Sequence, residues 1–446
     1  MVRRRLLFAS VVALVAMPCV VPDVARVSAA PTACTGWCGG GEYHSLSAVR
    51  LFDSTARPTG PTGPSLDVAV LDHGGVPADA TGVLAVVLDV HVISPTATGW
   101  ARVWGPAVGV APSAPSVHFQ KGAGASSTVV VRPATDGSVR VQLVSAAAGT
   151  AHVVVTISGW FSTSAYRSDD VSVARGGRWR LLPASARLLD TRNGTRPDTP
   201  IGSGRQRRVP IAGVSGVPND ATVSAVIVAV TVWSATVPSF VTVLPEVPTV
   251  RPRSLDVPTI PGVTRTNLVV IPLGADGSVQ VFNYAGVVNV SLDLLGYVHL
   301  GEAESTRVGR VIPLATTYRA LDTRRPEFGA SPLGPAATED WSFASFVNSV
   351  TLGGTWAGHQ SGLIGSLVNA GLTRTSTTAP AVSSNLSVYP GVTAVPPVGP
   401  TLATREKVAA SMPVVGRYGT ANTLRVRNAA GRAHYALDIS AVVLAD

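Results

Sequence analysis

Lysine and helical periodicity are what this sequence lacks most. Lys121 and Lys407 are the only lysines, so nearly all of the positive charge behind the formal net charge of +9 is arginine. Almost no segment repeats its apolar residues at the three- and four-residue intervals of an amphipathic helix, which argues against a helical protein. Runs of Val, Thr and Ile cut by Gly and Pro are typical of an all-β chain instead.

Cysteine is also scarce, with three residues in the whole chain. Cys19 lies in an apolar leader, which leaves Cys34 and Cys38 four residues apart. In an exported protein this even pair predicts a small local disulfide. Zinc is the alternative, but two thiols without further cysteines or a histidine pair make a poor zinc site.

The first 29 residues have the pattern of a secretory signal peptide. A basic start at 3–5 precedes the apolar run Leu6–Val21, and Val27, Ser28 and Ala29 supply small residues for cleavage. No later segment is long and apolar enough to span a bilayer. We therefore expect a secreted, extracellular protein, either released or held at the cell wall.

Catalytic motifs are missing as well. The chain has no Gly-x-Ser-x-Gly, no His-Glu-x-x-His and no phosphate-binding loop, and its eight histidines are scattered. His152 and His434 occupy the same position of a repeat where another copy has Asn289, so that position needs only a polar group. We expect no catalytic residues, no metal and no cofactor, with an undetected secreted hydrolase as the remote alternative.

What the chain does contain is one unit repeated three times. The copies open on Arg50–Ser54, Arg187–Arg192 (Arg-Leu-Leu-Asp-Thr-Arg) and Arg319–Arg324. The first two close on a glycine, Gly159 and Gly296, the same 106 residues after the opening aspartate. The third copy closes on Ala441–Val442 and lacks the Gly-Val-Pro turn of the others. A fixed period of this kind indicates an array of similar units.

Alternation along the strands assigns a dry face to each copy. Side chains alternate across a strand, so apolar residues two apart share a face. The shared positions are Ala101 and Val103, Val241 and Val243, Leu386 and Val388, Val139 and Val141, Val279 and Val281, and Leu424 and Val426. The long apolar runs 83–92 and 223–232 predict central strands buried on both faces.

These patterns predict three tandem antiparallel β-sandwich, or barrel-like, domains. The predicted boundaries are signal peptide 1–29, an N-terminal segment 30–46, β repeat 1 at 47–162, a linker at 163–183, β repeat 2 at 184–299, a linker at 300–312 and a divergent β repeat 3 at 313–446. A basic aromatic group, Arg178–Arg180, falls in the first linker and is interpreted as a solvated spacer.

The order Arg-Leu-Leu-Asp-Thr-Arg, Gly-Val-Pro-x-x-Ala, Asp-Gly-x-Val and Asp-x-x-Gly-Tyr resembles a tandem repeat of secreted actinobacterial proteins. The second copy matches best, through 187–192, 216–221, 276–279 and 293–297. The resemblance covers nearly the whole chain after the leader. It implies a cell-surface or accessory module, in some proteins attached to wall-degrading enzymes, and implies no biochemical activity of the repeat itself.

The opening Asp-Thr-Arg has two interpretations. Asp190 with Arg192, and Asp322 with Arg324, have the chemistry to bind calcium or an anionic ligand. The structural alternative is that the aspartate accepts turn amides and an arginine pairs with a neighbouring carboxylate. We favour the structural role, because the first copy has no arginine at the matching place.

The best binding candidate is the outer face of one strand in the first copy, with Trp100, Arg102 and Trp104. Two indoles with an arginine between them offer stacking surfaces for sugar rings and a cation for an anionic group. The alternative is a half-buried aromatic cluster at a domain contact. The partners expected are anionic cell-wall polymers or polysaccharide, other surface proteins or further copies of this chain. Nucleic acid is not expected, since the arginines are scattered.

Three function hypotheses follow from these observations. The first is a non-enzymatic secreted structural or adhesive protein of the cell surface or extracellular matrix. The second is an accessory protein that binds carbohydrate or cell-wall polymer. The third is the undetected hydrolase.

Overall fold

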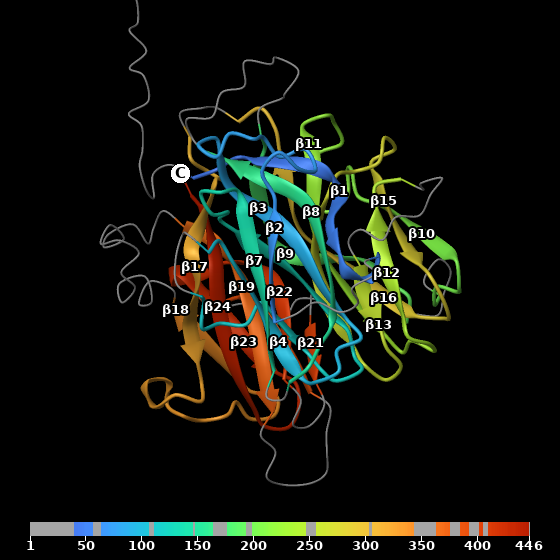
Figure 1. Ribbon diagram of the computed structural model, residues 1–446, viewed down its shortest axis with the longest axis vertical. Helices are drawn as coiled ribbons and strands as arrows, with labels where there is room; N and C mark the ends of the chain where they lie inside the picture. Colours follow the sequence, from blue (N-terminus) through green and yellow to red (C-terminus); the bar gives the residue numbers. More distant parts are fainter. Residues whose placement is uncertain are drawn as a thin grey trace, which may run out of the picture. The chain divides into compact units, whose positions relative to one another are not determined.

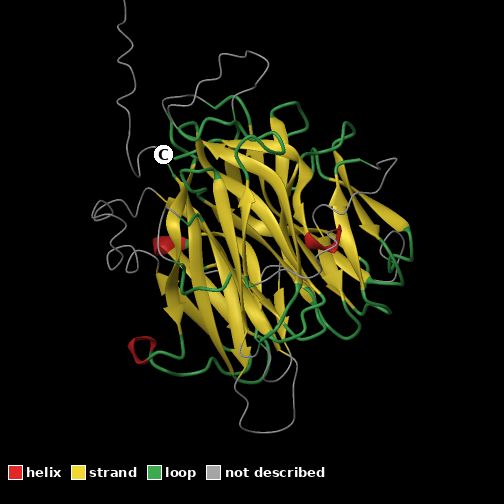
Figure 2. Cartoon of the chain, in the orientation of Figure 1, coloured by secondary structure: helices red, strands yellow, loops and turns green. Residues whose placement is uncertain are grey.

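The computed structural model describes residues 40–56, 64–106, 111–145, 148–163, 176–192, 199–246, 256–302, 306–342, 363–374, 384–391, 401–404 and 409–445. The described part is all β, with three short 3-10 turns, η1 (Ser54–Ala56), η2 (Pro326–Phe328) and η4 (Thr420–Asn422), and no α-helix among these residues (Figure 2). The all-β prediction is confirmed.

Six antiparallel sheets of four strands hold the strands, two sheets from each repeat. In repeat 1 the first sheet has the order β1 (Tyr43–Asp53), β8 (His152–Ser162), β3 (Val83–Ile93), β6 (Ala125–Val131). The second has the order β2 (Ser65–Ala69), β7 (Ser138–Ser145), β4 (Gly99–Trp104), β5 (Val117–Phe119).

Repeats 2 and 3 follow the same plan. The sheets of repeat 2 are β9 (Arg178–Asp190), β16 (Asn289–His299), β11 (Val223–Trp233), β14 (Arg265–Ile271), and β10 (Arg205–Pro210), β15 (Ser278–Asn283), β12 (Ser239–Leu244), β13 (Asp256–Thr259). Those of repeat 3 are β17 (Val311–Asp322), β24 (Ala433–Leu444), β19 (Leu363–Arg374), β22 (Ala410–Arg417), and β18 (Thr338–Ser342), β23 (Thr423–Asn428), β20 (Ser384–Pro390), β21 (Thr401–Thr404).

The prediction of three tandem sandwich domains is wrong. The six small sheets form a six-bladed β-propeller. The described residues from 40 to 445 belong to one compact unit, whose strands are labelled in Figure 1. The sequence pattern identified the dry face of each repeat correctly: every predicted dry-face position listed above is buried. It also predicted that the central strands are buried on both faces, but it did not reveal which surface covers the second face.

The central strands show why the repeats do not stand apart. In β3, Val86, Leu88 and Val90 pack in the core of repeat 1, while Ala85 and Val87 on the other face join a cluster with residues of repeats 2 and 3. The central strand β11 divides its side chains in the same way. Because alternate residues point to opposite faces, a run that is apolar at every position must bury both. The second face can be buried only by a neighbouring repeat.

The first linker is shorter than predicted, because its last residues begin a strand. Residues 178–183 belong to β9 and pair with β16. Trp179 is fully buried and packs edge-on against Tyr43 of repeat 1, with ring centroids 6.2 Å apart. Residues 311 and 312, predicted to end the second linker, likewise begin β17. The supposed spacer is therefore part of the core between repeats.

Equivalent positions of the three repeats meet at one junction. Arg178 and Arg310 both contact Oε1 of Glu42, with Nη2–oxygen distances of 3.3 and 3.0 Å. The edge strands β6, β14 and β22, one from each repeat, also contact one another. Each repeat therefore touches both of the others, which fixes the spacing of any site formed between them.

Candidate functional site

The repeated Arg-Leu-x-Asp-Thr-Arg sequence forms an ion-pair network in repeat 2. Arg187 donates to both oxygens of Asp293 at 2.8 and 3.1 Å and to Asp190 at 2.9 Å. Asp190 also accepts the Arg192 side chain at 2.9 and 2.6 Å and its backbone N–H at 3.1 Å. The hydrogen bond from Arg192 is the main reason that the pKa of Asp190 falls to about 2. The network joins the first strand of the repeat to its last, as predicted.

Repeat 3 builds the same network and repeat 1 keeps only half of it. Arg319 contacts Asp438 at 2.7 and 3.0 Å, and Asp322 accepts both Arg319 and Arg324. In repeat 1 the acid on the last strand is replaced by Thr156, and Arg50 pairs with Asp53. Repeat 1 thus lacks both the counterpart of Arg192, where it has Thr55, and the carboxylate that Arg187 binds in repeat 2.

The histidines at equivalent repeat positions have a structural contact. Nδ1 of His152 lies 3.2 Å from the hydroxyl of Ser54, and Nδ1 of His434 lies 3.2 Å from that of Thr323. In repeat 2 the hydroxyl of Thr191 donates to Asn289 at 3.0 Å. The same hydroxyl–polar contact in all three copies supports the prediction that this position needs only a polar group.

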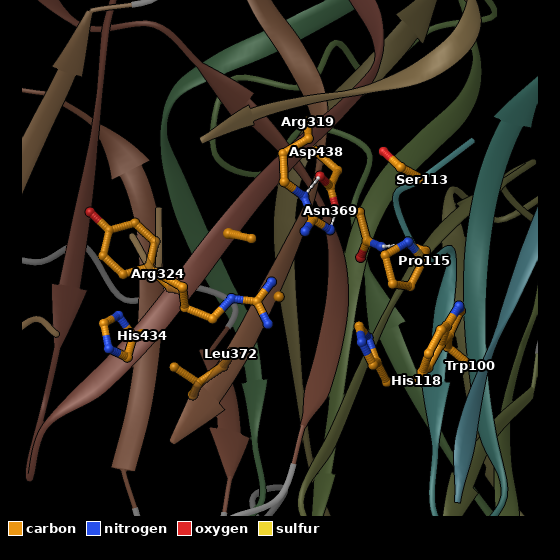
Figure 3. A pocket seen from close by; sticks show the side chains of 13 residues that line it. Trp100, Ser113, Pro115, His118, Arg319, Arg324, Asn369, Leu372, His434 and Asp438 are labelled. Carbon is orange, nitrogen blue, oxygen red and sulfur yellow. Dashed lines mark hydrogen bonds and ion pairs between the residues drawn. The ribbon is translucent and has the colours of Figure 1, made fainter. Parts of the chain in front are cut away.

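One cavity of about 220 Å³ lies where repeat 3 faces repeat 1 (Figure 3). Repeat 1 contributes Trp100, Ser113, Pro115 and His118, and the lining from repeat 3 includes Arg319, Arg324, Asn369, Gly371, His434 and Asp438. Figure 3 shows the rings of Trp100 and His118 on one side and the side chains of Arg324 and His434 on the other.

A glycine helps to keep this cavity open. Gly371 faces it from β19, and a Cβ placed there would meet only the carbonyl oxygen of Ala436, at 3.9 Å. The strand registers put Thr231 at the same position in repeat 2 and His91 in repeat 1. Repeat 3 therefore leaves room where the other repeats place a side chain.

Three buried polar atoms of cavity-lining residues have no hydrogen-bond partner: Nε1 of Trp100, Nδ1 of His118 and Oδ1 of Asn369. The amide nitrogen of Asn369 is occupied, since it donates to the carbonyls of Pro115 at 2.7 Å and Ser116 at 3.3 Å. Buried polar groups in folded proteins are nearly always paired with protein, water or ligand. Three residues that line this one cavity thus carry an unpaired polar atom, which makes the cavity the candidate binding site.

Charge in the cavity is set by burial and by the arginines. Burial first, and then Arg319 and Arg324, lower the pKa of His118 to about 4, so its ring is neutral at pH 7. Burial outweighs the Arg319 contact and raises the pKa of Asp438 above its ordinary value. Arg324 uses Nε and Nη2 to bind Asp322 and has an exposed side chain. Its remaining Nη1 edge is the part of the guanidinium left for a ligand.

Of the three binding residues predicted from the sequence, Trp100, Arg102 and Trp104, one lines the cavity and two do not. Trp100 is half-buried and lines the cavity. Arg102 is half-buried, its Nε is buried without a partner, and it is not among the lining residues. Trp104 is only 7% exposed, so it offers little ring surface to a ligand. Cys34 and Cys38 lie outside the described residues.

The residues that face Trp100 were not anticipated as ligand contacts. Arg324 and Asp438 were noticed in sequence, but as parts of a repeat and not as neighbours of the first copy. His118 and Asn369 carry no motif at all. Only the closure of repeat 3 onto repeat 1 brings these groups together, and no local pattern encodes that contact.

Comparisons with known proteins give no family. No family model matches the chain, and no curated protein matches it. Among solved structures, that of Broad Bean Stain Virus is 10% identical with a TM-score of 0.17, over 63% of this chain and 94% of the other. That of Sulfolobus Turreted Icosahedral Virus is 10% identical with a TM-score of 0.16, over 90% and 92%. Likeness this weak supports no functional argument.

The described residues contain neither a cluster of metal ligands nor a membrane-spanning helix. Within them, no three or more His, Cys, Asp or Glu side chains gather closely enough to hold a metal ion. The same part of the chain has no helix with the length and apolar character needed to cross a membrane.

Proposed function

We propose that this chain is a non-enzymatic, exported adhesive protein that binds saccharide in the cavity between repeats 1 and 3. The observation that carries the proposal is the set of unpartnered atoms on Trp100, His118 and Asn369 around one cavity beside an aromatic ring. Export follows from the signal-like residues 1–29, and a surface role follows from the resemblance to secreted repeats.

The chemistry of the lining suits a sugar ring. An indole offers a flat apolar face against which the C–H face of a sugar can stack. A free indole N–H donor, a neutral imidazole and an amide oxygen acceptor match hydroxyl groups, which both donate and accept. At about 220 Å³ the cavity is smaller than the 300–1,000 Å³ typical of drug-sized ligands, which favours a single ring at the end or side of a polymer.

A binding role fits the lining better than hydrolysis. Glycoside hydrolysis generally uses a pair of carboxyl groups across the scissile bond. Among the described residues that line the cavity, Asp438 is the single carboxylate, and it is held by Arg319 through two hydrogen bonds. The exposed edge of Arg324 favours a sugar that carries an acid group, in line with anionic wall polymers as partners.

Co-sedimentation of the full chain with insoluble chitin, cellulose and purified peptidoglycan tests the proposal. We expect retention on at least one of them, and Trp100→Ala should weaken it roughly thirtyfold, as for a central aromatic contact. Gly371→Thr, which introduces the residue of repeat 2, should fill the cavity and weaken retention similarly. Arg208→Ala, which removes an exposed arginine of repeat 2 that does not line the cavity, is the control for a substitution elsewhere on the surface.

Thermal unfolding of each variant would establish that the fold is intact. Failure of the wild-type chain to bind any of the three polymers would overturn the proposal. Equal retention of wild type, Trp100→Ala and Gly371→Thr would overturn the assignment to this cavity.

A further inference from the structure

An exposed aromatic platform stands at one tip of repeat 2. Tyr284 is 55% exposed and stacks on Phe240, with ring centroids 4.8 Å apart and planes 19° from parallel. Val237 and Val287 beside it are 38% and 44% exposed. We call these four side chains the Tyr284 platform. Stacking on Phe240 covers one face of the tyrosine ring and leaves the other as the exposed one.

The platform is held rigidly by hydrogen bonds. Asn283, which is fully buried, donates to the carbonyls of Ile201 at 2.9 Å, Gly202 at 3.2 Å and Gly286 at 2.9 Å. The N–H of Val287 donates to the hydroxyl of Thr236 at 2.9 Å. A ring fixed in this way loses little conformational entropy when a ligand stacks on it.

The fold itself does not require the tyrosine. Repeat 3 builds the same loop, in which Asn428 donates to the carbonyls of Leu333, Gly334 and Gly431. Ala429 stands there in place of Tyr284 and makes the equivalent backbone bond, to Asn385, at 2.9 Å; the Tyr284 bond to Phe240 is 3.1 Å. Repeat 3 thus builds this loop with Ala429 in place of Tyr284 and Asn385 in place of Phe240, so the loop itself does not require the stacked pair.

The platform occupies the repeat position of the cavity tryptophan. Phe240 of β12 pairs with Pro258 of β13, and Trp100 of β4 pairs with His118 of β5. Phe240 and Trp100 therefore hold equivalent positions in their repeats. Four side chains are far too few for a protein interface, which needs about 800 Å² from each partner. A single ring face flanked by two valines matches the apolar face of a sugar.

We infer that the Tyr284 platform is a second saccharide subsite, which binds another ring of the same polymer by stacking. This inference rests on the proposed function. Two subsites on one chain raise the affinity for a polymer that reaches both above that for a single sugar, because the second contact forms intramolecularly.

The test compares polymer with fragment, using whichever of chitin, cellulose and peptidoglycan the wild-type chain retains. Tyr284→Ala should weaken retention on that polymer at least tenfold. It should leave affinity for a soluble single-sugar fragment of the polymer, measured by calorimetry, unchanged, because the fragment is expected to prefer the cavity. Tyr284→Phe should behave as wild type, and Val214→Ala, an exposed valine of another turn, is the control.

The outcomes separate the two proposals. If Trp100→Ala loses polymer binding while Tyr284→Ala retains it fully, the second subsite is overturned and the cavity stands. If Tyr284→Ala loses binding and Trp100→Ala does not, the platform stands as a saccharide site and the cavity assignment is overturned. If neither variant changes binding, both are overturned. Repeat 3 builds the matching loop with Ala429, so we expect Tyr284→Ala to fold, and thermal unfolding checks this directly.

Discussion

At the scale of single residues, the ion-pair network shows how equivalent arginines can contribute differently to stability in different repeats. Asp293 is completely buried, and its charge is compensated by Arg187, which is itself 21% exposed. In repeat 1 the same strand position holds Thr156, so Arg50 has no buried carboxylate of this kind to neutralise. Removing one partner of a buried pair leaves an uncompensated charge, and that cost exceeds the value of most exposed pairs.

We therefore expect Arg187→Ala to lower the free energy of unfolding by about 3–5 kcal/mol. Arg50→Ala, the matched control, should lower it by about 1 kcal/mol or less. Urea denaturation followed by tryptophan fluorescence measures both. Equal losses for the two variants would show that the buried carboxylate does not make the difference.

Residue patterns predicted these networks better than they predicted the cavity. The Asp-Thr-Arg contacts lie within one repeat, so comparison of the three copies was enough to separate structure from function. The cavity depends on contacts such as Asn369 to Pro115, which are 254 residues apart in the chain. Gly371, which opens it, looks in sequence like any glycine in a strand.

At the scale of elements, the closing glycine of repeat 1 is explained by the first strand opposite it. A Cβ on Gly159 of β8 would lie 2.2 Å from the hydroxyl oxygen of Tyr43 in β1. In repeat 3 the registers place Ala441 opposite β17 at the same position, with Val311 where repeat 1 has the tyrosine. The departure of the third copy from the Gly-aromatic ending thus follows from the smaller residue on its partner strand.

Gly159→Ala should displace the Tyr43 ring and lower the free energy of unfolding by about 1–3 kcal/mol, since overpacking a rigid core forces strained rotamers. Ala441→Gly, the reverse change in repeat 3, should cost about 1 kcal/mol or less, mainly through backbone entropy. Differential scanning calorimetry of the two variants provides the comparison. A larger loss for Ala441→Gly would contradict the steric explanation.

The buried face of the strands that were compared across the three copies could be predicted from alternation, and the structure confirms it. The number of layers could not. Alternation shows that one face of a strand is buried, but not which surface covers it. In β11 the neighbouring repeats cover the second face. Trp179 and Arg178 looked like linker residues for the same reason, because Trp179 packs against Tyr43 and Arg178 pairs with Glu42, both in another part of the chain.

At the scale of the whole molecule, the contact between repeats 1 and 2 contains a buried acid. Asp89 on β3 accepts a hydrogen bond from Asn267 of repeat 2 at 2.6 Å and is only 2% exposed. Burial, reinforced by the nearby charge of Asp256, raises the pKa of Asp89 to about 8, although the Asn267 hydrogen bond opposes the change. The folded protein therefore keeps this proton at neutral pH.

This proton makes stability depend on pH. Between the ordinary aspartate pKa of 3.8 and about 8, the unfolded chain has lost the proton and the folded chain retains it, so the free energy of unfolding falls as the pH rises. Asp89→Asn should flatten this decline, which we expect to reach a few kcal/mol between pH 4 and pH 8.

Urea titrations at pH 5 and pH 8 measure the decline. Asp276→Asn is the control, because hydrogen bonds from Ser278 and Arg208 lower the pKa of Asp276 to about 2, outside this range. An unchanged pH dependence in Asp89→Asn would contradict the buried, protonated acid.

The junction at Glu42 also governs the order in which the chain can fold. Arg310, which binds Glu42, lies 268 residues after it in the sequence, and Asp293 lies 106 residues after its partner Arg187. Each first strand thus remains unpaired until the last strand of its repeat has been synthesised, and the junction closes only after the third repeat has begun. Such long-range closures make folding slow, on the order of milliseconds to seconds even in small β proteins. The newly made chain must spend that time with its strand edges unpaired, so we expect a chaperone to protect it from aggregation.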